Sequence, residues 1–246
     1  PYQPIEREHR IMRQVLEVLD AFRHPVTITT KGAAVTDDLD ILGRMGRQGL
    51  AHVTLSLTTL DARLGRRLEP RAAAPGRRVA AIRALAKAGV PVGVNLAPII
   101  PGLTDHELER LMEAAAEAGA RSASYTVLRL PLEVAPLFRD WLEREFPDRA
   151  RRVMGLVREM HGGRDYDSAW GRRLRGEGVH AKLLARRFER AVAEHGLAHG
   201  WPALRTDLFA PPARPGDQLD LGLWAAGGPH GASGLWSAWQ PEPEPR

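Results

Sequence analysis

The chain has 246 residues, of which 43% are hydrophobic and 26% charged, and its formal net charge is +5 at pH 7. This length suits one large domain or two small ones, and no apolar run approaches the ~18–20 residues of a membrane-spanning helix. Because there is no cysteine, the chain offers no disulfide, no thiolate metal site and no cysteine ligand for an iron–sulfur cluster. No secretory signal follows Pro1, so we expect a cytoplasmic protein.

Arginine dominates the basic residues, because only Lys31, Lys87 and Lys182 among the 35 are lysines. Guanidinium groups bind carboxylates and phosphates in a planar, bidentate manner. We expect most of these arginines on solvated surfaces; a polyanionic partner such as nucleic acid is the alternative.

Helices and strands alternate over the first 160 residues. Apolar spacing predicts helices over residues 5–22, 37–49, 77–88, 104–118 and 135–160, the last interrupted at Pro147. Runs of apolar and β-branched residues predict strands over 26–31, 51–57, 90–96 and 120–128. Thr104 and Glu107 have the spacing of a capping box at a helix start.

This alternation predicts right-handed crossovers and a parallel sheet, so the expected fold class is α/β. Four strands are few for a closed barrel, and the pattern begins with a helix that no strand precedes. A sheet that starts at 26–31 exposes an unpaired edge, which native proteins avoid. We therefore expect the chain to be a fragment, with βα units before Pro1 in the complete protein.

The composition changes after residue 160. Residues 162–178 are rich in glycine and alternating charge and predict a loop, 180–195 predict a helix, and 201–223 are irregular. The Gly, Pro and Ser content and the PEPEP run predict a disordered tail over 224–246. We therefore divide the chain into a core (1–160), a loop-and-helix extension (161–223) and a tail (224–246).

Polar residues lie at the carboxyl ends of the predicted strands, where parallel α/β folds bind ligands. Lys31 ends the first strand, Ser56 lies in the second and Asn95 in the third. Lys31 suits an anion contact or a Schiff base, and the alternative is a surface ion pair. Ser56 and Asn95 are candidates for ligand contacts, and the alternatives are a small buried hydroxyl and a structural hydrogen bond.

Several segments, in this order and spacing, carry a family resemblance. They are residues 1–6, 26–31, 56–61, 68–72, 88–94 and 97–105, followed by 162–168 and 175–178. Together they resemble the radical S-adenosylmethionine (SAM) enzymes, and among these a bacterial group whose core is similar to spore photoproduct lyase, a DNA-repair enzyme. The resemblance covers about residues 1 to 223.

The resemblance implies a partial (βα)₆ barrel of the TIM type that lacks its first strands. In such enzymes a CxxxCxxC loop binds a [4Fe–4S] cluster that chelates SAM, and reduction by an electron donor yields a 5′-deoxyadenosyl radical. By the same resemblance, Lys31 and Ser56 match SAM contacts, and Tyr2 and Gln3 follow the strand end where the SAM amino group is held. Asn95 is expected near the SAM adenosine or the substrate.

The absence of cysteine places the cluster motif upstream of Pro1, so we expect this chain alone to bind no cluster and to be inactive. The resemblance identifies no substrate, and nucleic acid is a candidate by analogy with the lyase. Two other hypotheses stay open. One is a lyase or aldolase-type barrel that uses Lys31 as a Schiff-base amine. The other is a non-enzymatic nucleic-acid binder that uses its arginines.

Overall fold

A computed structural model describes residues 1–201 and 203–212. Within this part of the chain, residues from Pro1 to Ala210 form a compact unit. The tail predicted over 224–246, and much of the irregular stretch predicted over 201–223, lie outside the described residues. Among the described helices, none is both long enough and apolar enough to traverse a bilayer.

The centre of the unit is a sheet of five parallel strands in the order β1-β2-β3-β4-β5. The strands are β1 (Val26–Thr30), β2 (Ala51–Leu57), β3 (Val92–Ile99), β4 (Ser122–Val127) and the short β5 (Ala198–His199). Each strand pairs in parallel with its neighbour in sequence, and helices connect the strands. The predicted α/β class and parallel sheet are therefore confirmed.

The helices follow the predicted rhythm. They are α1 (Glu6–His9), α2 (Ile11–Ala21), α3 (Leu39–Arg47), α4 (Ala62–Leu68), α5 (Pro75–Lys87), α6 (Leu108–Glu117), α7 (Val134–Glu145), α8 (Pro147–Met160), α9 (Arg172–Arg175) and α10 (Gly178–Glu194). Turns of 3₁₀ helix span Ala33–Asp38 and Asp105–Glu107. The break predicted at Pro147 is confirmed, because proline occupies the first turn of α8, where its missing N–H costs nothing.

Three local predictions were incomplete. The helix predicted over 5–22 divides at Arg10, whose φ of 46° is left-handed, and α2 then starts with the Glu6 carboxylate bound to the Met12 amide at 3.0 Å. Helix α4 was not predicted, although Asp61 caps it through the amides of Arg63 and Leu64. Helix α9 lies within the stretch predicted as a loop.

The capping box predicted from Thr104 and Glu107 is wrong. The Thr104 hydroxyl accepts a hydrogen bond from the amide of Ile100 at 2.9 Å. The buried Glu107 carboxylate instead reaches the segment after β2, where the Leu60 amide donates to it at 2.8 Å and the Thr59 hydroxyl also binds it. Helix α6 consequently starts only at Leu108.

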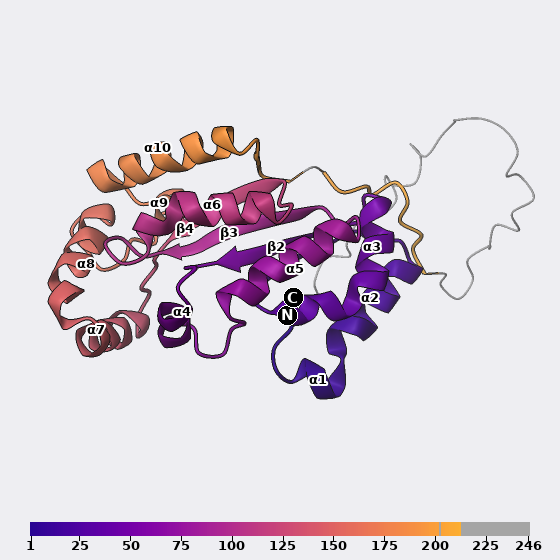
Figure 1. The fold of residues 1–246 in the computed structure, drawn as a ribbon, viewed down its shortest axis with the longest axis horizontal. Coiled ribbons are helices and arrows are strands. Elements are labelled where there is room, and N and C mark those ends of the chain that lie inside the picture. The colour runs from indigo at the N-terminus through magenta and orange to yellow at the C-terminus, as the bar shows by residue number, and fades with distance from the viewer. Residues whose placement is uncertain (202, 213–246) are drawn as a thin grey trace, which may run out of the picture. The chain divides into compact units, whose positions relative to one another are not determined.

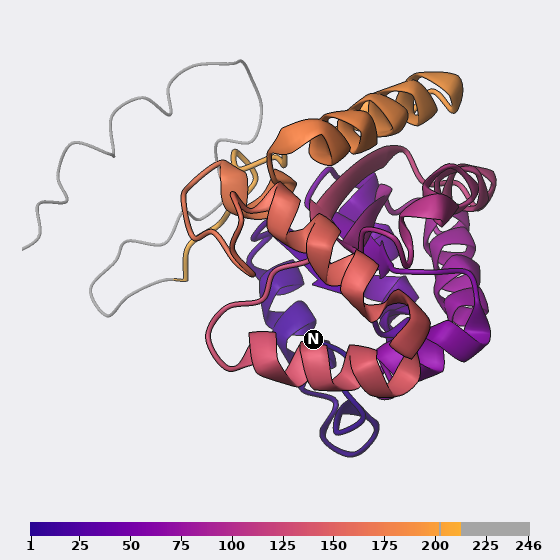
Figure 2. The ribbon, with the colours of Figure 1, turned by 90° about the vertical axis from the view of Figure 1, so that its left-hand side faces the viewer.

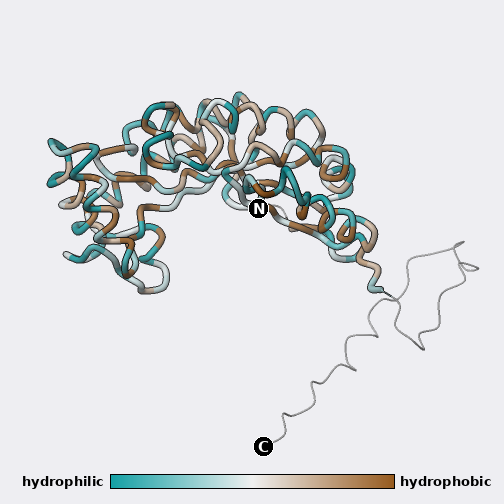
Figure 3. Tube along the Cα trace, turned by 90° about the horizontal axis from the view of Figure 1, so that it is seen from below, coloured by the Kyte–Doolittle hydropathy of each residue, from teal (hydrophilic) through white to brown (hydrophobic). Residues whose placement is uncertain are grey.

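The two faces of the sheet differ in chemistry. On β2, Val53, Leu55 and Leu57 are fully buried; helices α3 and α5 pack on this strand and α6 packs on β3 (Figure 1). The opposite face carries polar side chains, and Thr27 and Thr29 on edge strand β1 are exposed. Figure 3 shows the unit as an arch, with the N-terminus on the concave side. One face thus packs against helices to form the core, while the other face is polar.

Helices α7 and α8 lie beyond the carboxyl ends of the strands, to which the arrowheads in Figure 1 point, and Figure 2 shows them in front of this edge. A second apolar cluster joins them to the segments that follow β2, β3 and β4, and it includes Leu64, Leu103, Leu128, Leu142 and Val153. The carboxyl edge therefore has walls on two sides, one from the sheet and one from this helix pair.

Candidate functional site

A cavity of about 500 Å³ lies at the carboxyl ends of β1 and β2. Its lining includes Tyr2, Gln3, Lys31, Ser56 and Arg71. Four of the five residues predicted as cofactor contacts therefore meet in one place, although the N-terminal segment and the two strands are separate in sequence. The fifth, Asn95, does not line this cavity and lies on the next strand.

The strand register explains how these side chains come together. Thr30 is opposite Leu55, so Lys31 lies level with Ser56, and Ser56 is opposite Asn95 on β3. Asn95 is in turn opposite Ser124 on β4. Because side chains at equal heights in parallel strands point to the same face, this row crosses the polar face of the sheet.

Glu69 fixes Lys31 within this site. The Lys31 ammonium donates to Oε1 of Glu69, and the Thr58 hydroxyl donates to the same oxygen at 3.0 Å. Arg78 binds the other oxygen, Oε2, at 2.7 Å. Arg78 is itself buried and also donates to the carbonyl oxygen of Ser56 at 3.0 Å. The network thereby ties the end of β1 to the end of β2.

The charge state of Glu69 follows from these partners. Burial disfavours its carboxylate, but the hydrogen bonds and charges of Lys31 and Arg78 outweigh this effect and hold the pKa of Glu69 below its ordinary value. Glu69 is thus ionised at neutral pH. Lys31 both forms an ion pair and lines the cavity, and 37% of its side chain is exposed.

Tyr2 and Gln3 contribute differently to the cavity. The buried Tyr2 hydroxyl donates to Oδ2 of Asp38 at 2.9 Å. Burial, reinforced by the charge of Asp38, raises the pKa of Tyr2 well above its ordinary value. Gln3 is exposed at the cavity. The hydroxyl of Tyr2 is therefore already engaged, whereas the side chain of Gln3 faces solvent.

Asn95 has an unsatisfied acceptor. Its Oδ1 is buried and has no hydrogen-bond partner in the described part of the chain. Leaving such an atom unpaired costs about 1–3 kcal/mol. The structural hydrogen bond considered for this amide oxygen is therefore absent among the described residues, and the oxygen keeps its full capacity as an acceptor.

Two residues that shape the site, Glu69 and Arg78, were not identified from the sequence, and neither was Trp201 on the polar face of the sheet. Glu69 follows α4 and Arg78 lies on α5, and no local pattern marks Glu69 as the partner of Lys31 and Arg78. Trp201 stacks on His52 with ring centroids 4.0 Å apart. A Cβ on Gly93 would lie 2.1 Å from the Trp201 ring, so the ring occupies the space that glycine leaves. Trp201 thus covers the polar face far from the carboxyl edge.

A comparison with protein families identifies this arrangement. The model of the radical SAM superfamily matches residues 2–115. Residues 2–115 therefore resemble the members of this superfamily. The segment contains Tyr2, Gln3, Lys31, Ser56 and Asn95, and the resemblance predicted from the sequence is confirmed at this level.

Similar proteins are found in bacteria and archaea. An uncharacterized protein of Mycobacterium tuberculosis is 32% identical over 160 residues, which are 64% of this chain and 47% of that protein. An uncharacterized protein of Methanocaldococcus jannaschii is 26% identical over 147 residues, or 60% of this chain and 53% of that protein. The chain spans about half the length of the curated relatives it matches.

Solved structures share the fold of most of this chain. A mutant of spore photoproduct lyase superposes with a TM-score of 0.54 at 18% identity, covering 79% of this chain and 56% of that chain. Spore photoproduct lyase complexed with dinucleoside spore photoproduct gives a TM-score of 0.53 at 17% identity, with the same coverage. At such identities the likeness concerns the fold, and it confirms the predicted similarity to the core of this lyase.

Proposed function

We propose that the complete protein is a radical SAM enzyme and that this chain supplies the side chains that hold SAM. The observation that carries the proposal is the convergence of Gln3, Lys31 and Ser56 on one cavity, beside the unsatisfied oxygen of Asn95. These groups come from different segments of the radical SAM match, which spans 2–115.

The chemistry of the cavity suits SAM. A volume of about 500 Å³ lies within the range of roughly 300–1,000 Å³ that is usual for small-molecule sites. Lys31 offers a cation for the SAM carboxylate, Ser56 and Gln3 offer hydroxyl and amide groups, and Asn95 offers an acceptor. Bound SAM supplies the deoxyadenosyl radical chemistry of the superfamily.

The residues of this chain do not fit the [4Fe–4S] cluster. The chain has no cysteine, and residues 1–201 and 203–212 contain no group of three or more His, Asp or Glu side chains placed to hold a metal ion. The proposal therefore assigns the cluster, and contact with its electron donor, to residues outside this sequence. We expect this chain alone to form no cluster and to be inactive.

Glu69 and Arg78 are positioning residues in this proposal. Glu69 binds the Lys31 ammonium at the carboxyl end of β1, and the buried Arg78 binds the other carboxylate oxygen of Glu69. A ligand carboxylate then meets a cation whose position is set before binding, which lowers the entropy cost of association. The same ion pair disfavours the Schiff-base hypothesis, because an amine nucleophile must be free of its proton and of such a partner.

For the substrate, we propose nucleic acid. Two observations support this class. The lyase that shares the fold is described in complex with a dinucleoside photoproduct, and the chain has a net charge of +5 with arginine as its main cation. Arginine suits phosphate better than lysine does, because its planar fork donates two parallel hydrogen bonds.

Binding of labelled SAM to the 246-residue chain, measured by equilibrium dialysis, tests the proposal. Lys31→Gln should weaken binding by about tenfold, the effect of one charge-assisted contact. Lys87→Gln is the matched control, because Lys87 is an exposed lysine on α5 and its replacement removes the same charge. Equal effects of the two variants, or no SAM binding by the wild type, contradict the proposal. A borohydride-trapped carbonyl adduct on Lys31 would instead favour the Schiff-base enzyme.

A further inference from the structure

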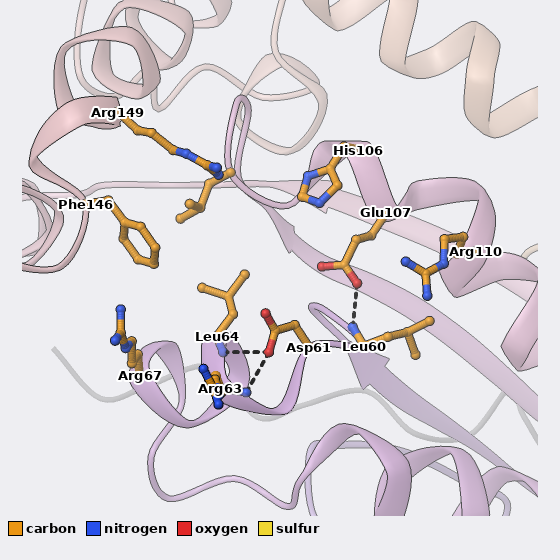
Figure 4. Close-up of a pocket in the computed structure, with 11 residues that line it drawn as sticks. Leu60, Asp61, Arg63, Leu64, Arg67, His106, Glu107, Arg110, Phe146 and Arg149 are labelled. Atoms are coloured by element: carbon orange, nitrogen blue, oxygen red, sulfur yellow. Dashed lines mark hydrogen bonds between the residues drawn. The ribbon is translucent and has the colours of Figure 1, made fainter.

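A second cavity, of about 620 Å³, lies between α4, the turn that leads into α6, and the start of α8 (Figure 4). Four arginines line it from three helices: Arg63 and Arg67 on α4, Arg110 on α6 and Arg149 on α8. His106 lies on the same wall. No short stretch of sequence brings these cations together, since they are spread over more than a third of the chain.

Most of these guanidinium groups have no acidic partner. Arg67 pairs with Glu145 at 3.5 Å. Arg63, Arg110 and Arg149 form no ion pair within residues 1–201 and 203–212, and all three are exposed. Unpaired cations that face a common hollow repel one another, so an anion bound between them relieves an existing cost.

The two carboxylates that line the cavity are already engaged by the protein (Figure 4). Asp61 caps α4, accepting from the Arg63 amide at 2.7 Å and the Leu64 amide at 3.2 Å. Glu107 accepts from the Leu60 amide and from the Thr59 hydroxyl. Four guanidinium groups therefore face two carboxylates that already bind backbone donors, and the cavity keeps an excess of positive charge.

The remaining lining is apolar. Leu60, Leu64, Leu103 and Phe146 complete the wall, and Leu64 and Leu103 are buried. This combination suits a ligand that carries anionic oxygens on one part and a flat or apolar group on another. An aromatic ring beside cations is a common surface for a nucleobase or sugar.

We propose that this cavity binds phosphate groups, supplied either by the backbone of a nucleic-acid strand or by a small phosphorylated molecule. The second cavity is separate from the proposed SAM site, because none of the four arginines lines the first cavity. The strand as source rests on the nucleic-acid substrate proposed above. The two cavities are close in sequence, because Ser56 at the end of β2 lines the first cavity and Leu60 and Asp61, which follow β2, line the second.

The test compares two triple variants of the 246-residue chain with equal net charge. Arg63→Gln, Arg110→Gln and Arg149→Gln together remove the unpaired cations of the cavity. Arg77→Gln, Arg83→Gln and Arg186→Gln together are the control, because these arginines are exposed on α5 and α10 and do not line the cavity. Pyrophosphate and a single-stranded oligonucleotide are the two probes, and calorimetry and fluorescence anisotropy measure their binding.

For the oligonucleotide, three lost phosphate contacts should reduce the slope of log K against log[salt] by about 2, since single strands contribute about 0.7 for each contact. The control should leave the slope within about 0.5 of the wild type. For pyrophosphate, the cavity variant should bind at least about tenfold more weakly.

Loss of both probes only in the cavity variant supports the backbone source. Cavity-dependent binding of pyrophosphate without the oligonucleotide supports the small-molecule source and refutes the proposed substrate class. Equal losses in both variants, or no binding of either probe, overturn the inference. In that case SAM binding that still depends on Lys31 leaves the first site standing, so the two failures are distinguishable.

Discussion

Replacing Glu69 by glutamine tests whether the ion-pair network organises the carboxyl edge of the sheet. The substitution keeps the size of the side chain and an acceptor oxygen but removes its charge. Loss of one partner of a buried ion pair usually costs about 3–5 kcal/mol. Arg78 is the partner to which this range applies, because only 3% of its side chain is exposed.

The local geometry lowers the expected loss of stability below this range. Arg78 keeps the carbonyl oxygens of Ser56 and Ala73 as acceptors at 3.0 and 2.7 Å. Lys31 is 37% exposed, so its pair with Glu69 contributes at most about 1 kcal/mol, as surface pairs do. We therefore expect Glu69→Gln to lower the free energy of unfolding by about 2–3 kcal/mol at pH 7.

Urea unfolding measures this effect, with Glu109→Gln as the control. Glu109 binds Arg187 at 2.6 Å, but half of its side chain is exposed, so this loss should stay below about 1 kcal/mol. A loss at Glu69 no larger than the loss at Glu109 would refute the reasoning.

The effect should also depend on pH in a defined direction. The pKa of Glu69 is lowered by folding, so its contribution is present above the ordinary carboxyl value near 4.5 and disappears as the pH falls through the lower folded value. The difference between wild type and Glu69→Gln should therefore shrink below about pH 4.5. A difference that stays constant from pH 7 to pH 3 contradicts the assigned ion pair.

Two further substitutions probe the polar face of the sheet. Asn95→Leu removes the unpaired oxygen, so the free energy of unfolding should stay the same or rise. SAM binding should weaken by about tenfold in the dialysis assay. A loss of stability without a change in SAM binding would indicate a structural role. Gly93→Ala places a Cβ 2.1 Å from the Trp201 ring and should cost about 1–3 kcal/mol through overpacking. Adding Trp201→Ala should recover part of that loss in the urea assay, and full additivity of the two changes would contradict the contact.

The departures from prediction arise from long-range contacts and from elements too short for a periodic pattern. Thr104 and Glu107 have the spacing of a capping box, yet Glu107 gains two donors on the segment after β2 that local spacing does not reveal. Helix α4 was missed although Asp61 is a good N-cap, because its seven residues contain little apolar periodicity. Strand β5 has two residues, which is too short for any periodic signal.

The sequence by itself determined the alternation of helices and strands, the α/β class, the position of β2 and the break at Pro147. These features depend on side-chain periodicity and backbone restrictions within a few residues. Positions at the strand ends made Lys31, Ser56 and Asn95 candidate ligand contacts, and family resemblance added Tyr2 and Gln3 and assigned all five to SAM or its neighbourhood. The parallel sheet then brings four of them to one cavity, as expected for residues at carboxyl ends of adjacent strands.

Only the tertiary structure decided which charges meet. Lys31 and Glu69 are 38 residues apart, and the arginines of the second cavity come from three helices. Sequence spacing does not encode such pairs, because their geometry depends on how the crossovers stack the strands and how α8 packs against the carboxyl edge. The composition shows that the chain has many arginines. Only the fold determines which of them pair with a carboxylate and which remain free to bind an anion.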